Sequence, residues 1–460
     1  MKSDHIYIKT WLLLLLAILV FLIDQLPFLV DMRPVMYDEA WYGDTAYNFA
    51  TGHGFRNVIV GSRGNSNFLL PLLTAGFMRV FGYNLLAIRL TAVLSGVVTL
   101  FFLWLSMKRM KVEGKAMALT FLFFVSTTAY NTLFRFGRPE CLAMMCMAGG
   151  LWFCLRYRES HSWGDMLGLS AFVLMAGCAH PYALLYFALI GVYLFVKYVK
   201  EKNWKGVFQL MVLLMAALAS VAAVAYVSKV YNGEAENYVS ERFSLKGIAE
   251  AVPVYFKRAF LSKYLVYMLP LSAILVYEAW KDKENKVLAV LGLVHLGLFP
   301  VFFSTDLEMV DLGLDYVVYV ATLLMAPFLS RLTRRYWRIL FLCYCLGSLG
   351  LSYYYNFGVK YERANSVLGV ELPTVVPKGE KVFGPIRQWP MLMETCYQSD
   401  HKSNPIHDID DYDYYVLNTQ DTAFFRSYRV FLPYVGSRLE LVYERQTRQY
   451  GTVQVYRNLK

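Results

Sequence analysis

Two adjacent carboxylic acids, Asp38 and Glu39, follow the first long apolar segment of the chain, within the aromatic-rich stretch Met36–Asp44. A carboxylate in a partly desolvated site has a raised pKa and can take a proton from an attacking hydroxyl group. Just beyond a membrane-crossing helix, such a pair would meet the polar head of a lipid-linked substrate. The alternative is a solvated loop in which Asp38 caps a helix.

Arginines near the same edge of the predicted membrane segments could hold a phosphate group, because a planar guanidinium pairs with two phosphate oxygens at once. Arg63, Arg135 and Arg138 are placed for this role. Arg138 shares a short turn with Glu140 and could instead simply pair with it. Arg89 is expected to extend its charged head to the membrane interface.

Two further side chains are candidates for contacts with a sugar. Tyr42 is the aromatic residue that we expect to touch it. His180 precedes Pro181 at a predicted outside turn. Its ring could hydrogen-bond a sugar or phosphate oxygen, or it could only satisfy the backbone of the turn.

The sequence predicts no cofactor and no metal site, although a divalent cation is not excluded. The predicted loop Ser304–Asp315 holds four acids and no basic residue. Carboxylates bind such cations, but the spacing is not that of an EF-hand. The seven cysteines show no zinc-like spacing with histidines.

The elements that must position these residues are membrane helices. Of the 460 residues, 57% are hydrophobic and 17% are charged, against about 25% charged in soluble domains. At ~1.5 Å per residue, an uncharged run of about 20 residues crosses the ~30 Å hydrocarbon layer. Such runs occupy residues 90–107, 116–134, 206–228, 287–305 and 339–359. This composition excludes a soluble enzyme, a disordered chain and a disulfide-rich secreted module.

About eleven transmembrane helices are expected, and this odd number places the two ends of the chain on opposite sides. The predicted spans are residues 10–30, 84–106, 115–133, 139–156, 166–180, 181–197, 207–229, 264–280, 287–304, 316–330 and 337–356. Residues 166–197 are read as a hairpin that turns at His180-Pro181, because proline marks a helix boundary. A single tilted helix there would move every later loop to the other side.

The net charge of +11 follows the predicted orientation rather than pointing to a nucleic-acid partner. The short segments on the side of the N-terminus hold 19 Lys and Arg residues, and the opposite segments hold 13 in more than twice the length. Cytoplasmic loops carry such an excess. We therefore expect a cytoplasmic N-terminus and an exported C-terminal domain. The absence of an Asn-x-Ser/Thr sequon from the predicted exported segments favours a bacterial plasma membrane.

The chain divides into a transmembrane domain, residues 1–357, and a polar extracytoplasmic tail, residues 358–460. Outer loops 31–83 and 230–263 interrupt the first part, and the amphipathic stretch Leu69–Val80 suits a helix on the membrane surface. Strand-like runs in the tail are residues 381–386, 412–418, 439–444 and 452–456. The expected fold class is an all-α polytopic membrane protein with a small α/β C-terminal domain.

In their order along the chain, several motifs resemble the GT-C membrane glycosyltransferases. The resemblance is to the group of protein O-mannosyltransferases and lipid A aminoarabinose transferases. The motifs are Asp38-Glu39, the turn Thr51–Phe55, the stretch Phe81–Leu90 with Arg89, and Phe134–Glu140. They cover residues 10–200, and the predicted topology and exported tail agree over the remainder.

The resemblance implies transfer of a hexosyl or pentosyl group from a polyprenyl-phosphate donor to a lipid, glycan or protein acceptor at the outer face. In that group the Asp acts as base or positions the acceptor, which corresponds to Asp38, and Glu39 would support the site. A single displacement would invert the anomeric centre. Residues 61–71 and Leu314–Tyr319 depart from the motifs of the group, so the sugar and acceptor stay open.

Two other functions compete with this interpretation. A surface-polysaccharide ligase or polymerase also uses polyprenyl-linked sugars, but its basic residues would stand in a late outside loop, and residues 304–315 have none. A transporter of lipid-linked sugars would need ionisable residues at mid-span and two pseudo-symmetric halves, which the predicted spans lack. The sequence therefore favours an inverting glycosyltransferase that acts as a monomer.

Overall fold

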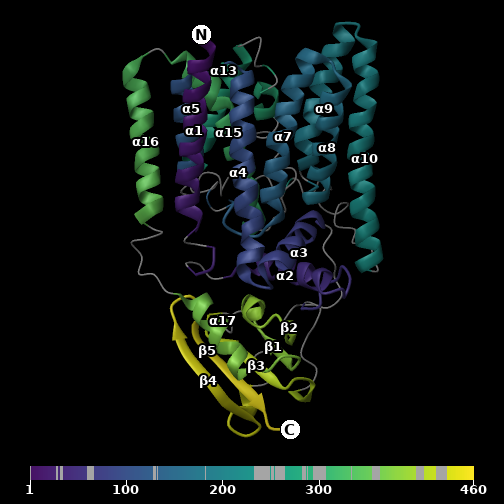
Figure 1. The fold of residues 1–460 in the computed structure, drawn as a ribbon, viewed down its shortest axis with the longest axis vertical. Helices are drawn as coiled ribbons and strands as arrows, with labels where there is room; N and C mark the ends of the chain where they lie inside the picture. Colours follow the sequence, from purple (N-terminus) through teal and green to yellow (C-terminus); the bar gives the residue numbers. More distant parts are fainter. Residues whose placement is uncertain are drawn as a thin grey trace.

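A bundle of long helices forms one end of the molecule, a small sheet domain forms the other, and two short helices lie between them (Figure 1). The computed structural model describes residues 2–26, 29–31, 35–59, 67–127, 131, 133–181, 183–232, 249, 253, 265–281, 286, 288–293, 307–332, 334–354, 363–399, 409–420 and 432–460. The N-terminus lies at the free end of the bundle, and the C-terminus lies in the sheet domain at the opposite end.

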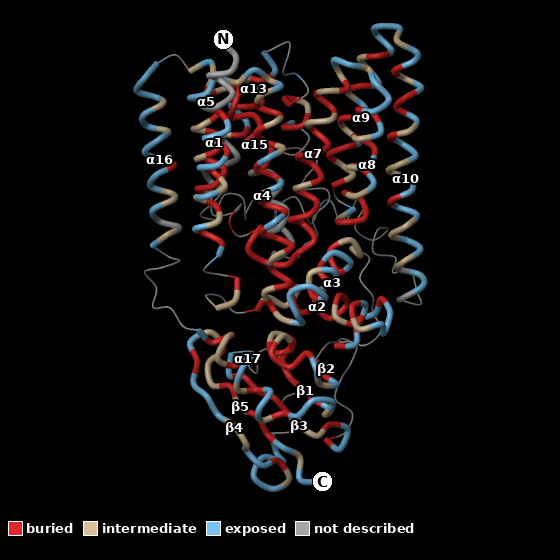
Figure 2. Tube along the Cα trace, viewed as in Figure 1, coloured by how far each residue is buried: buried red, intermediate tan, exposed pale blue. Residues whose placement is uncertain are grey.

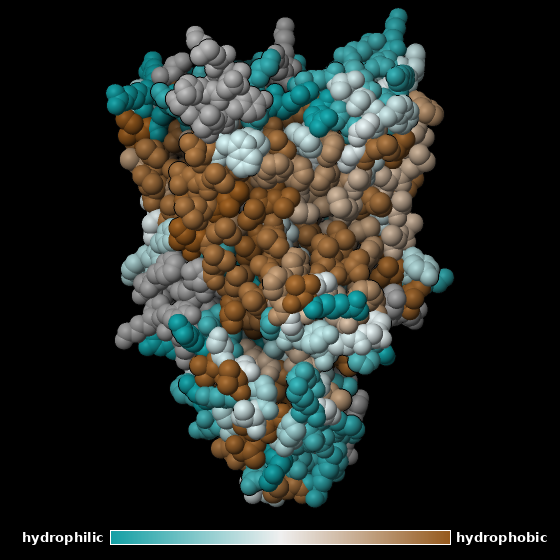
Figure 3. Space-filling model, viewed as in Figure 1, coloured by the Kyte–Doolittle hydropathy of each residue, from teal (hydrophilic) through white to brown (hydrophobic). Residues whose placement is uncertain are grey.

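The bundle presents an apolar surface to its surroundings. Its described helices are α1 (Lys2–Gln25), α4 (Leu85–Arg109), α5 (Gly114–Ser126), α7 (Pro139–Ser160), α8 (Trp163–Ala179), α9 (Ala183–Lys200), α10 (Trp204–Asn232), α13 (Leu265–Lys281), α15 (Leu307–Arg331) and α16 (Arg335–Tyr353). Figure 3 shows a continuous hydrophobic belt between two polar ends. By length and composition, α4, α9 and α10 can each cross a bilayer, and shorter apolar helices accompany them. The chain is a multi-pass membrane protein.

The hairpin predicted over residues 166–197 is confirmed. Helix α8 ends at Ala179 and α9 begins at Ala183, so the chain turns at His180-Pro181. His180 has an extended backbone, with φ −156° and ψ 115°. The total of eleven spans stays a prediction, because much of the predicted span 287–304 lies outside the described residues.

The acidic segment Ser304–Asp315, expected as a loop, is helical from Leu307 onward. Helix α15 begins there, nine residues before the predicted start of the span at residue 316. The prediction was wrong because it started the helix only after the last acidic residue of this segment. A helix satisfies its own backbone hydrogen bonds and can therefore continue beyond the hydrocarbon layer. Residues 304–306 lie outside the described part of the chain.

Two surface helices, α2 (Tyr37–Ala50) and α3 (Leu69–Phe81), lie between the bundle and the sheet domain. Helix α3 confirms the prediction of a helix over Leu69–Val80. It buries one face through Leu70 and Met78, while Leu72 and Val80 are exposed. An amphipathic helix with exposed apolar residues suits the interface between membrane and water.

The C-terminal domain is a five-stranded mixed sheet with one helix, α17 (Ala364–Val375). Its strands are β1 (Lys381–Gly384), β2 (Cys396–Ser399), β3 (Tyr414–Asn418), β4 (Leu439–Thr447) and β5 (Gly451–Asn458). The strand order is β2-β1-β3-β5-β4, with β1 parallel to both of its neighbours and the β3–β5 and β5–β4 pairs antiparallel. The small α/β domain is confirmed; β2, which is only four residues long, and α17 were not anticipated.

Helix α2 packs against other elements on two sides, and these contacts help to position its first turn. The short helix η3 (Ile386–Met391) of the C-terminal domain packs against α2. A Cβ atom added at Gly43 would lie 2.7 Å from Ile88 Cδ1 of α4 and 2.8 Å from Trp389 Cζ3 of η3. Figure 2 shows that the chain is largely buried where bundle, surface helices and sheet domain meet. A side chain at position 43 would therefore require Ile88 or Trp389 to move.

The substitution Gly43→Ala is therefore expected to lower the stability of the folded protein by about 1–3 kcal/mol, the usual cost of overpacking a tight contact. The measurement is thermal unfolding of the purified protein in detergent. Gly76→Ala in α3 is the matched control, because nothing lies within 4 Å of its added Cβ; alanine there should be neutral or mildly stabilising. Equal unfolding temperatures for the two variants would contradict the contact.

Candidate active site

The two adjacent acids lie in the first turn of α2, where the helix dipole favours negative charge. Their environments differ. The Asp38 side chain is 40% exposed and lies with its Oδ2 atom 3.1 Å from Arg138 Nη2. The Glu39 side chain is 0% exposed and pairs with Arg89 of α4. One acid therefore faces an accessible region and the other is enclosed.

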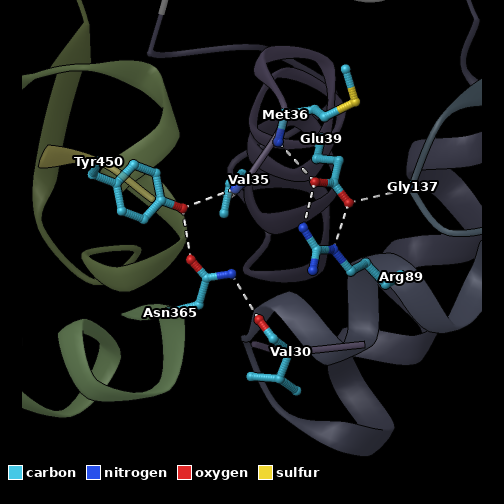
Figure 4. A network of polar contacts seen from close by, with 8 residues as sticks. All are labelled: Val30, Val35, Met36, Glu39, Arg89, Gly137, Asn365 and Tyr450. Atoms are coloured by element: carbon cyan, nitrogen blue, oxygen red, sulfur yellow. Dashed lines mark hydrogen bonds and ion pairs between the residues drawn. The ribbon is translucent and has the colours of Figure 1, made fainter. Parts of the chain in front are cut away.

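Glu39 makes a fully occupied set of contacts (Figure 4). Arg89 donates from Nε to Oε1 at 2.8 Å and from Nη2 to Oε2 at 2.9 Å. The backbone N–H of Gly137 also donates to Oε1, at 3.2 Å, and that of Met36 donates to Oε2, at 2.9 Å. Glu39 thus joins α2 to α4 and to the turn before α7. Such a carboxylate is suited to supporting a site rather than to receiving a proton.

The position of Arg89 corrects an expectation from the sequence. Arg89 was expected to extend to the membrane interface, but it is fully buried. Its charge is compensated by Glu39, fifty residues earlier in the chain. A guanidinium with such a bidentate partner no longer needs water at the interface.

Arg138 lies between two carboxylates. Its Nη2 atom is 3.1 Å from Asp38 Oδ2 and 2.9 Å from Glu140 Oε1. Pro139 begins α7 at its first position, where a missing backbone N–H costs nothing. Glu140 therefore stands in the first turn of α7, beside Arg138. The pairing of Arg138 with Glu140 that the sequence left open is present, together with the contact to Asp38.

Tyr42 and His180 join the same group. Tyr42 lies one helical turn after Asp38, and its hydroxyl accepts a hydrogen bond from Asn67 Nδ2 at 3.1 Å. Burial and the nearby charges of Asp38 and Glu140 raise the pKa of the Tyr42 hydroxyl, so it stays protonated. His180 lies close enough to Glu140 for an electrostatic interaction.

The site cluster, as we name it, comprises six residues: Asp38, Tyr42, Asn67, Arg138, Glu140 and His180. Four of them were predicted as site residues. Glu140 was noted only as a partner for Arg138, although its place in the Arg-Pro-Glu turn was a usable signal. The sequence did not indicate Asn67 as a site residue, because only the fold brings its side chain to Tyr42.

Two predicted phosphate-binding residues are not brought to this cluster by any described contact. Arg135 Nη2 lies 2.9 Å from Asp24 Oδ2 of α1, and both side chains are buried. Gln25 also donates to Asp24 Oδ2, at 3.0 Å. This pair joins α1 to the turn before α7. Arg63 lies outside the described residues.

The structure offers no evident metal site within its described part. No group of three or more His, Cys, Asp or Glu residues there could hold a metal ion. The side chains of the acidic segment 304–315, where a divalent cation was left open, lie outside the described part.

Comparisons with known proteins agree with the fold. Residues 66–226 match the family model described as dolichyl-phosphate-mannose-protein mannosyltransferase. Among solved structures, the chain is similar to ArnT from Cupriavidus metallidurans bound to undecaprenyl phosphate, with a TM-score of 0.66 and 14% identity over 97% of each chain. The apo state of that protein matches with a TM-score of 0.64 and 13% identity over 100% of this chain and 99% of that chain.

No curated protein matches the sequence. At these identities the structural likeness shows the fold alone, and the family model matches only residues 66–226. Residues 66–226 include α3, α4, α5 and α7 to α9, the elements that carry Arg89, Arg138, Glu140 and His180. Through that segment the chain is similar to the dolichyl-phosphate-mannose-protein mannosyltransferases, and it shares the fold of the ArnT structures.

Proposed function

We propose that this protein transfers a sugar from a polyprenyl-phosphate donor to an acceptor at the outer face of a bacterial plasma membrane. The observation that carries the proposal is the 3.1 Å contact between a partly exposed carboxylate, Asp38, and a guanidinium, Arg138. A base and a phosphate ligand stand side by side, where the bundle meets the sheet domain. The similarity to an ArnT structure bound to undecaprenyl phosphate supports this class of donor.

In the proposed reaction, an acceptor oxygen attacks the anomeric carbon while its proton passes to Asp38. The bond between that carbon and the phosphate oxygen breaks, and polyprenyl phosphate leaves with the electron pair. Because attack and departure occur on opposite faces in one displacement, the anomeric configuration inverts. Phosphate is already a good leaving group, so the protein has mainly to orient it and to neutralise its charge.

Arg138 is the proposed phosphate ligand, and its two carboxylate contacts suit this role. In the structure its Nη2 atom lies near both Asp38 and Glu140. A bound phosphate would compete with Asp38 for the guanidinium, while Glu140 keeps the arginine in place. Arrival of the donor would then free the Asp38 carboxylate to act as a base.

The remaining predicted residues have supporting roles in this proposal. Tyr42 would contact the sugar, since it is one helical turn from Asp38, and His180 would approach the sugar or phosphate beside Glu140. Arg63 and Arg135 stay candidate phosphate ligands. The termini lie at opposite ends of the molecule (Figure 1), which supports a cytoplasmic N-terminus with an exported C-terminal domain.

The substitution Asp38→Asn is expected to reduce transfer by about 10²–10⁴-fold, the usual contribution of a general base. The measurement is mass spectrometry of envelope glycolipids and glycans in a deletion strain that carries each variant at equal protein level. Asp410→Asn is the matched control, because Asp410 is a comparably exposed acid paired with an arginine, Arg438, in the C-terminal domain. Near-normal product with Asp38→Asn would remove Asp38 from the mechanism.

Glu39→Gln is expected to act on stability, unlike Asp38→Asn. Breaking a buried ion pair leaves Arg89 uncompensated, which costs about 3–5 kcal/mol. The readout is thermal unfolding in detergent, together with the amount of protein in the membrane. The double variant Glu39→Gln/Arg89→Gln should lose less than the sum of the two single variants, because neither charge is then left buried alone. Strict additivity would show that the pair does not join α2 to α4.

A further inference from the structure

A tyrosine hydroxyl of the C-terminal domain contacts the chain immediately before α2. The Tyr450 side chain, from the turn between β4 and β5, is fully buried. Its hydroxyl accepts a hydrogen bond from the backbone N–H of Val35 at 2.9 Å and donates one to Asn365 Oδ1 at 2.6 Å. Figure 4 shows Tyr450 and Asn365 facing this segment on the side away from Arg89.

Further contacts from the C-terminal domain hold the preceding residues. Asn365 donates from Nδ2 to the carbonyl of Val30 at 2.8 Å, and the N–H of Ser366 donates to Asp31 Oδ1 at 2.8 Å. Gln449 donates to the carbonyl of Asp31 at 2.7 Å. The domain therefore holds both described ends of the segment that leads from α1 to α2.

Val35 is separated from Asp38 by only two residues. The next backbone N–H, that of Met36, donates to Glu39. The N-terminus of α2 is thus fixed by Tyr450 on one side and by the Glu39–Arg89 pair on the other. Because neighbouring residues of a helix are about 100° apart around its axis, holding this turn also determines where Asp38 points.

The Tyr450 hydroxyl is suited to a permanent contact. Burial raises the pKa of Tyr450, so the group keeps its proton and continues to donate to Asn365. Loss of this hydroxyl would leave the Val35 N–H without that acceptor in a buried place, which is unfavourable.

We infer that Tyr450 is a positioning residue for the transfer reaction: through the Val35 amide, the C-terminal domain sets the place of Asp38 relative to Arg138. This inference rests on the proposed function, in which Asp38 is the base. It gives the exported domain a direct part in turnover, beyond any contact that it makes with an acceptor.

The test is Tyr450→Phe, which keeps the ring and removes only the hydroxyl. Amide hydrogen exchange of residues 35–41 should become at least fivefold faster, and product in the complemented deletion strain should fall at least tenfold at equal protein level. The Kd for undecaprenyl phosphate, measured on the purified protein in detergent, should rise no more than twofold. Arg138 and Glu140 belong to the turn before α7 and to α7 itself, and a displaced Asp38 would compete less for the guanidinium.

Tyr415→Phe is the matched control. Tyr415 is also a fully buried tyrosine of the sheet, and its hydroxyl donates to the Ile409 carbonyl within the domain, at 2.6 Å. This variant should leave all three readouts within twofold. If Tyr450→Phe does not accumulate, Asn365→Ala should give the same pattern in weaker form.

Product formation by Tyr450→Phe equal to that of Tyr415→Phe would overturn the inference, whatever the unfolding temperatures. Asp38→Asn is measured in the same strain to separate the two proposals. An inactive Asp38→Asn with a fully active Tyr450→Phe overturns only the positioning role. An active Asp38→Asn overturns the proposed function itself.

Discussion

The buried ion pair between Glu39 and Arg89 is the interaction on which the arrangement of the site depends. A charge enclosed in an apolar setting is costly unless it is paired and hydrogen-bonded, and both oxygens of Glu39 are fully used. These contacts hold the first turn of α2 in its observed orientation. Asp38, the neighbouring residue, is thereby turned toward Arg138 and left partly exposed.

Two adjacent acids thus serve opposite purposes because their surroundings differ. The enclosed one joins three elements, and the accessible one is the base of the proposed reaction. The guanidinium of Arg138 lies between two carboxylates, and in the proposed reaction a phosphate would replace one of them.

The surface helix α2 is where the membrane bundle and the C-terminal domain meet. Gly43 allows α4 and η3 to approach from two sides, and the Tyr450 hydroxyl holds the segment before the helix. Parts of the chain more than 400 residues apart therefore fix a single helical turn. Through these contacts the C-terminal domain would contribute to the geometry of the proposed site.

The sequence by itself determined the membrane class, most helix positions, the hairpin at His180-Pro181 and the Asp38-Glu39 motif, because hydrophobicity and motif spacing are local properties. Only the tertiary structure decided which charges pair. The partner of Arg89 is 50 residues away, that of Arg135 is 111 residues away, and Tyr450 meets Val35 across 415 residues. No local pattern encodes such distant contacts, since they arise only when the helices and the sheet domain pack together.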